Sequence, residues 1–229
     1  PAYQVADSAD CMVGFFSSSS LALVAPGLAT YLHRSEKPLR LIISPHLSQN
    51  DIEALEGKAI DEQEIVKRYF NDVFSSEEQI VKYTLRSLSF LIKEERLQIK
   101  IALLKDALFH LKVWLFHLNV GTLAVHGSTN FTLSGISKNK EQISVSKSWM
   151  DNTQEYSTRT LENQFESLWA NTETDCHVIA LPKALSDKLL LSFSTSKRPT
   201  EEELSTLYNR SLVGEDLLTD RQNFHIPPD

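Results

Sequence analysis

The fold is decided by one stretch, Phe109–His117 (FHLKVWLFH), in which apolar and polar residues alternate and Val, Trp and Phe are frequent. Such alternation is typical of a β-strand with one buried face. Residues two apart in a strand share a face, so we expect His110 and Lys112 to project together while Leu111 and Val113 point into a core. The pattern predicts an imidazole beside a fixed cation.

A second cluster follows on the next predicted strand. The short apolar segment 122–125 comes after Gly121 and leads into Gly-Ser-Thr-Asn at 127–130, with Glu141 further on. Hydroxyl and amide groups donate hydrogen bonds to phosphate oxygens, as an ammonium does. Two neighbouring strands would therefore bring phosphate-handling side chains together.

The remaining segments alternate between strand and helix patterns. Strands are expected at 12–17, 39–44, 97–104, 142–148 and 178–181, and helices at 21–33, 52–55, 62–74, from 75 to about 92, and 159–169, with 151–157 as a polar loop. This order predicts an α/β fold with a mixed central β-sheet flanked by helices on both faces. We expect one domain over 1–195 and a polar, partly helical tail over 196–229, which would form a linker to a following domain.

Composition narrows the class of protein. The chain has 229 residues, 41% hydrophobic and 23% charged, which argues against disorder. Its net charge of −7 argues against a surface dedicated to nonspecific nucleic-acid binding, although lysines and an arginine lie in sequence around the two clusters at 112, 138, 140, 147 and 159. Those cations could equally form a solvated loop.

Cysteine spacing and hydropathy give further expectations. The two cysteines, Cys11 and Cys176, have no metal-binding spacing, and no apolar run is long enough for a membrane span. The start of the chain has no signal-peptide pattern, so we expect a cytoplasmic protein that has no metal site and makes no membrane contact.

The two clusters together resemble the phospholipase D superfamily, whose motif is His-x-Lys followed by Gly-Ser-x-Asn. The similarity is strict over about 109–145. The continuation through Phe131, Thr132, Gly135, Asn139 and Glu141 resembles the nuclease branch, found in small bacterial endonucleases and metal-independent restriction enzymes. The resemblance implies a phospholipase D-like sandwich and a phosphodiesterase that needs no cofactor.

The resemblance also implies roles for individual residues. One imidazole attacks phosphorus to give a phosphohistidine, and a second imidazole protonates the leaving oxygen and then activates water. The implied catalytic set is His110, Lys112, Asn130 and Glu141, with Ser128, Thr132 and Lys140 as substrate-binding residues. Lys112 and Asn130 would hold the phosphate, and Glu141 would fix the imidazole tautomer.

The chain departs from the commonest family pattern in two places. His117 stands where many members carry an Asp, and the gap before Gly127 is longer. We assign the acidic role to Glu141 and take His117 as a core residue or one behind the site. Only one His-x-Lys occurs in the chain, so the resemblance predicts a homodimer with a shared site.

Three functions stay open at this point. The first is a metal-independent DNA endonuclease. The second is a catalytically weak phosphate- or DNA-binding dimerisation module, suggested by the missing Asp. The third is a phospholipid hydrolase or transferase, which the absence of a basic amphipathic helix disfavours. Similar single-motif domains begin bacterial DEAD-box-like helicases and restriction proteins, so a linked helicase domain could follow Asp229.

Overall fold

The computed structural model describes most of the sheet and the two principal helices. The described residues are 2–14, 30–31, 33–44, 63–64, 66–67, 79–104, 109–127, 142–183, 185, 187, 192, 200 and 202. The expected helix over 52–55 and nearly all of the tail, 196–229, lie outside them. Residues 30, 31, 33 and 34 and residues 63, 64, 66 and 67 are helical, within or beside the helices expected at 21–33 and 62–74.

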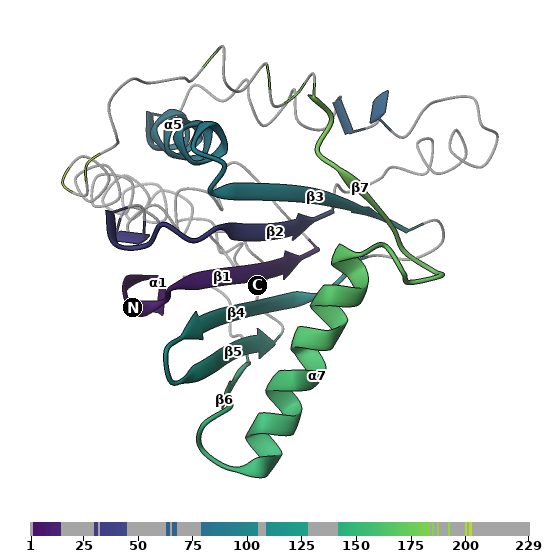
Figure 1. The fold of residues 1–229 in the computed structure, drawn as a ribbon. Coiled ribbons are helices and arrows are strands. Elements are labelled where there is room, and N and C mark those ends of the chain that lie inside the picture. The colour runs from purple at the N-terminus through teal and green to yellow at the C-terminus, as the bar shows by residue number, and fades with distance from the viewer. Residues whose placement is uncertain are drawn as a thin grey trace, which may run out of the picture.

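A seven-stranded mixed sheet forms the centre of the molecule (Figure 1), in the order β6-β5-β4-β1-β2-β3-β7. The strands are β1 (Ser8–Val13), β2 (Leu39–Ile43), β3 (Leu97–Leu103), β4 (Lys112–Leu118), β5 (Gly121–Gly127), β6 (Ile143–Lys147) and β7 (His177–Ala180). β1, β2 and β3 are parallel to one another, and every other pair is antiparallel. The predicted fold class is confirmed. The strand expected at 12–17 is wrong in position, since β1 spans Ser8–Val13 and its first half contains the charged but buried Asp10.

Helices cover both faces of this sheet. α5 (Gln79–Lys93) places Leu85 and Leu91 in the core of one face, together with the short α1 (Ala2–Val5). α7 (Asn152–Trp169) places Phe165 and Leu168 in the core of the other face. In Figure 1, α7 runs across the sheet from beside β6 towards β7. None of the described helices combines the length and the hydropathy needed to cross a membrane.

The start of α7 corrects the expectation of a loop at 151–157. Asp151 is the N-cap: its Oδ1 accepts from the Gln154 backbone N–H at 2.9 Å, and the Gln154 side chain donates back to Oδ2. The Gln154 backbone hydrogen bond is the chief reason that the pKa of Asp151 is lowered. The polar residues that suggested a loop form a largely exposed first turn of the helix.

Two valines test the contribution of the core. Val13 is completely buried at the end of β1, whereas Val5 on α1 is 50% exposed. We expect Val13→Ala to lower the free energy of unfolding by about 2 kcal/mol, through lost burial and a residual cavity. Val5→Ala, the matched control, should change it by no more than about 0.5 kcal/mol. Urea unfolding measures both, and equal losses would contradict the assigned core.

Candidate active site at one edge of the sheet

The described parts of the two predicted clusters lie at one end of the central strands. β4 begins at Lys112, paired with Val13 at the end of β1. β5 ends at Gly127, paired with Ile143 at the start of β6, and His126 lies opposite Val113. Lys112 of His-x-Lys and the first residue of Gly-Ser-x-Asn therefore lie on adjacent strands at the same end of the sheet, as the sequence predicts.

His110 lies outside β4, which corrects the expectation of a strand over Phe109–His117. The strand begins at Lys112 because its partner β1 ends at Val13, so residues before Lys112 have no neighbouring strand to pair with. His110 is exposed, Phe109 is buried in the core beneath α7, and Leu111 packs against that core. His110 is thus an exposed residue just before the start of β4.

Gly14 holds this segment against the end of β1. Its N–H donates to the Leu111 carbonyl at 2.8 Å. A Cβ on Gly14 would lie 1.5 Å from the Phe109 carbonyl oxygen and 3.0 Å from the His110 Cα. Only a residue without a side chain permits this approach, so Gly14 fixes where the backbone of His110 runs.

Lys112 is turned into the protein. The residue is 3% exposed, and its Nζ donates to the His110 carbonyl oxygen at 2.9 Å. A buried ammonium has to satisfy its donors within the protein. The expectation that His110 and Lys112 project together from one strand is therefore wrong. His110 is exposed before the strand begins, whereas Lys112 is buried and its ammonium binds the backbone of the same motif.

Gly127 is also fixed by a close approach. A Cβ there would lie 2.1 Å from the Gln142 carbonyl oxygen, which is backbone and cannot move aside cheaply. The glycine of the Gly-Ser-x-Asn cluster thus allows the segment leading into β6 to pass close to the end of β5. The other predicted residues, Ser128, Asn130, Thr132, Lys140 and Glu141, lie outside the described residues.

A second polar cluster, which the sequence analysis missed, lies under α7. Asp10 on β1 is 4% exposed and binds Arg40 on β2 through two hydrogen bonds of 2.6 Å. Its Oδ2 also lies 2.8 Å from the His117 Nε2. The two charged residues are direct register partners within apolar strands. Each of these two apolar strands contains one charged residue, and the two charges are opposite in sign. That pattern is the sequence signal that could have revealed the pair.

His117 belongs to this second cluster. Its Nδ1 lies 3.0 Å from the Thr122 Oγ1 and 3.8 Å from the Glu162 Oε1. It is five residues along β4 from Lys112, a distance on the order of 16 Å. His117 is half-buried at the far end of the strand from His110, so it does not lie behind the motif as the sequence analysis allowed.

The same cluster attaches α7 to the sheet. Arg40 also binds the Glu166 Oε1 at 2.7 Å, and its guanidinium lies 4.7 Å from the centre of the Phe165 ring, which stacks on Trp169. Burial alone would raise the pKa of Asp10, but hydrogen bonds from His117 and Arg40 and their charges lower it below its usual value. Asp10 is therefore ionised, and through Arg40 it connects β1 and β2 to α7.

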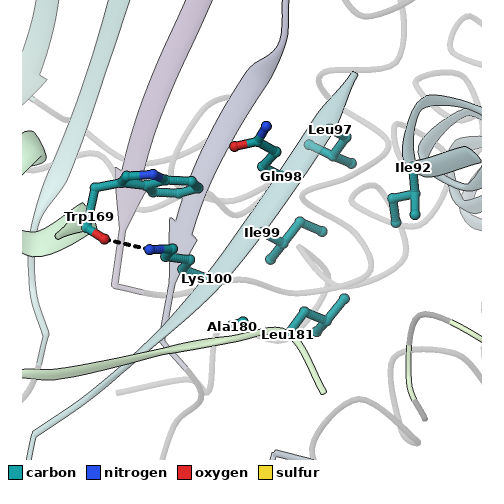
Figure 2. Close-up of a pocket in the computed structure, with 8 residues that line it drawn as sticks. All are labelled: Ile92, Leu97, Gln98, Ile99, Lys100, Trp169, Ala180 and Leu181. Atoms are coloured by element: carbon teal, nitrogen blue, oxygen red, sulfur yellow. Dashed lines mark hydrogen bonds between the residues drawn. The ribbon is translucent and has the colours of Figure 1, made fainter. Parts of the chain in front are cut away.

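A hollow of about 260 Å³ lies elsewhere, at the edge of β3. Figure 2 shows Ile92, Leu97 and Ile99 on its wall, with Lys100 reaching Trp169. The Lys100 Nζ donates to the Trp169 carbonyl at 2.5 Å and lies 4.6 Å from the centre of its ring, so it caps the end of α7. The hollow lies along the first half of β3, at the opposite end of the sheet from Lys112 and Gly127. It is not the candidate active site.

Among the described residues, no group of three or more His, Cys, Asp or Glu side chains could hold a metal ion.

Replacing Asp10 tests this connection of the strands to α7. We expect Asp10→Asn to lower the free energy of unfolding at pH 7 by about 2 kcal/mol, because Arg40 and His117 lose a buried charged partner. A carboxyl with a lowered pKa stabilises the fold above its unfolded pKa, about 3.9, and this contribution is lost as the pH falls through the folded pKa. Urea unfolding from pH 5 to pH 3 should show this loss in the wild type and not in Asp10→Asn.

Replacing Gly14 tests the backbone contact. We expect Gly14→Ala to lower the free energy of unfolding by at least about 2 kcal/mol, since the new methyl collides with the Phe109 carbonyl. Amide hydrogen exchange should also rise at Leu111 and Lys112. A variant as stable as the wild type, with unchanged exchange, would contradict the close approach.

Comparison with known proteins identifies a family. The family model described as "Cardiolipin synthase, PLD-like domain" matches residues 28–169, more than half of the chain. Among solved structures, a polyphosphate kinase from Porphyromonas gingivalis aligns with 92% of this chain at 9% identity and a TM-score of 0.43. The chain spans about a quarter (24%) of the length of that kinase. Comparison with curated proteins finds no match.

The matched region contains both β4 and β5, and with them His110, Lys112 and Gly127. The expected superfamily is confirmed, and it indicates phosphodiester or phosphoryl-transfer chemistry in general. The nuclease branch stays a prediction. A His-x-Lys motif beside the start of Gly-Ser-x-Asn, at the edge of a mixed sheet and within the matched residues, shows that the chain belongs to the PLD-like domain family.

Proposed function

We propose that the chain is a metal-independent phosphodiesterase, and more narrowly a cytoplasmic DNA endonuclease that acts through a phosphohistidine. The observation that carries the proposal is the position of His110, exposed at the sheet edge, beside Lys112 and next to the strand that ends at Gly127. Family membership supports the general chemistry. The narrower choice of DNA rests on the sequence after Asn130, which resembles the nuclease branch.

In this proposal the exposed imidazole of His110 attacks phosphorus, and the bond to the leaving oxygen breaks as a second imidazole gives that oxygen a proton. Water, deprotonated by the second imidazole, then releases the phosphate from His110. Lys112 and Asn130 hold the nonbridging oxygens, with Ser128, Thr132 and Lys140 as further phosphate contacts and Glu141 orienting the ring. A second copy supplies the second imidazole, because the chain has a single His-x-Lys.

A second candidate function is a phosphate- or DNA-binding dimerisation module with little turnover, attached to a helicase or restriction protein beyond Asp229. One observation favours it: Lys112 is almost completely buried and donates to a backbone carbonyl, so its ammonium would have to turn outward to meet a phosphate. Turnover in a chelator separates the two candidates.

Plasmid cleavage in EDTA tests the proposal. We expect the wild type to cut without a divalent metal, and His110→Ala to cut about 10³-fold more slowly, because the nucleophile is lost. His177→Ala is the matched control, since His177 is also exposed and lies on β7, at the opposite side of the sheet. Binding without cleavage would favour the module, and a requirement for added metal would exclude the histidine mechanism.

A further inference from the structure

The hollow beside β3 contains a stretch of strand edge that has no neighbouring strand. β3 spans Leu97–Leu103, and β7 pairs with only its last four residues, from Lys100 on. One further hydrogen bond continues the ladder, from the Leu181 N–H to the Ile99 carbonyl at 3.1 Å. The chain then turns away from the sheet. Within the described part of the chain, nothing pairs with the outer edge of β3 before Ile99.

The hydrogen bonds on either side show which backbone groups of this segment point outward. The Leu39 N–H of β2 donates to the Arg96 carbonyl at 2.8 Å. Backbone groups alternate in direction along a strand, so those of Leu97 and Ile99 face away from β2. The bond from Leu181 to the Ile99 carbonyl follows the same alternation. The Leu97 N–H and carbonyl and the Ile99 N–H therefore point outward, and no described residue pairs with them.

These backbone groups line the floor of the hollow. Leu97 is only 5% exposed, and both it and Ile99 line the hollow of about 260 Å³. The great majority of buried backbone N–H and C=O groups in proteins have a hydrogen-bond partner. Nearly buried groups that no described residue satisfies, at the floor of a hollow, indicate that a ligand supplies the partner.

The walls of the hollow come from the two faces of the sheet. Figure 2 shows Leu97 and Ile99 projecting towards Ile92 of α5, where the three form an apolar wall. Lys100 projects the other way, towards the indole of Trp169. An apolar wall and an aromatic wall on either side of a backbone edge fit a flat ring that lies in the plane of the sheet.

The backbone edge also determines the chemistry of such a ring. The Leu97 carbonyl is an acceptor and the Ile99 N–H is a donor, two residues apart on the same edge. The matching ligand has a donor next to an acceptor on one side of a planar ring. Nucleobases have this arrangement on their Watson–Crick edge, and proteins bind them by hydrogen bonds to that edge and by stacking.

Lys100 adds a positive charge beside the hollow. Its ammonium has three donors, and among the described residues the Trp169 carbonyl is its hydrogen-bond acceptor. The charge suits a phosphate attached to the ring. The volume lies below the roughly 300–1,000 Å³ of sites that enclose a whole drug-sized ligand, so the hollow encloses one ring and leaves its substituents at the mouth.

We propose that this hollow binds a nucleotide, with its base against the edge of β3 and its phosphate near Lys100. The site lies at the opposite end of the sheet from Lys112 and Gly127, and it does not rest on the proposed nuclease activity. It is a second binding site, separate from the candidate active site.

Titration calorimetry of the 229-residue chain with AMP, GMP, CMP and UMP tests the proposal. We expect at least one monophosphate to bind with a Kd of about 1 mM or tighter. Ribose 5-phosphate, which has no base, should bind at least tenfold more weakly, because it cannot pair with the strand edge.

Amide NMR spectra locate the bound nucleotide. The Ile99 N–H should shift downfield as it gains an acceptor, while the amides of Lys112 and Gly127 stay unchanged. A nucleotide bound at the candidate active site would instead shift the amides of Lys112 and Gly127.

Two variants separate the base from the phosphate. Ala180→Phe fills the hollow and should weaken binding at least tenfold. His177→Phe is the matched control, since His177 is exposed on the same strand and does not line the hollow. Lys100→Met should weaken binding of the monophosphate and not of its nucleoside. Thermal melting shows whether each variant is folded.

Three results would overturn the inference. They are the absence of binding by all four monophosphates at about 10 mM, binding that Ala180→Phe leaves unchanged, and amide shifts confined to the motif end of the sheet. Equal weakening of nucleoside and nucleotide by Lys100→Met would overturn the phosphate position. Failure of the chain to cleave DNA in EDTA would remove the proposed function and leave this site standing.

Discussion

The antiparallel pairing of β1 with β4 at the centre of the sheet is the constraint on which the rest of the structure depends. β1 joins the other two parallel strands, β2 and β3, to the antiparallel strands β4, β5 and β6, which contain Lys112 and Gly127. The length of β1 also decides where β4 begins, because the ladder stops at Val13 and Lys112. One backbone boundary therefore sets both the shape of the sheet and the exposure of His110.

The two ends of β4 use polar groups for different purposes. At one end, Gly14 and Lys112 bind backbone atoms of the motif and define a rim that stays open at His110. At the other end, His117 joins Asp10 and Arg40 in a cluster that reaches Glu166 on α7. The anchor that attaches the helix is separate from the candidate site, so a substitution at either end can be interpreted without the other.

Local pattern was sufficient to predict most of the sheet, and non-local contacts explain the errors. The alternation through β4 and the apolar runs of β2 and β3 identified those strands. Nothing in the alternation of Phe109–His117 could show that its partner strand ends at Val13. The Asp10–Arg40 pair likewise joins strands 30 residues apart in the sequence.

The start of α7 was missed for a different reason. Asp151 with Gln154 three residues later is a local capping signal, and the polar composition of the first turn outweighed it in the interpretation. For the site, the sequence correctly placed Lys112 and Gly127 on neighbouring strands and wrongly placed His110 within a strand, and the roles given to all the site residues stay predictions.

The contact of Gln154 with Lys147 has a consequence for assembly. A sheet with a bare outer strand can recruit copy after copy into a fibre, since each addition recreates the same edge. At the outer strand β6, the Gln154 side chain already accepts the Lys147 N–H. The other outer strand, β7, has four residues and is followed closely by Pro182, which has no backbone N–H to donate. Growth by strand addition is disfavoured at both margins, which favours closed assemblies of defined size and protects against aggregation.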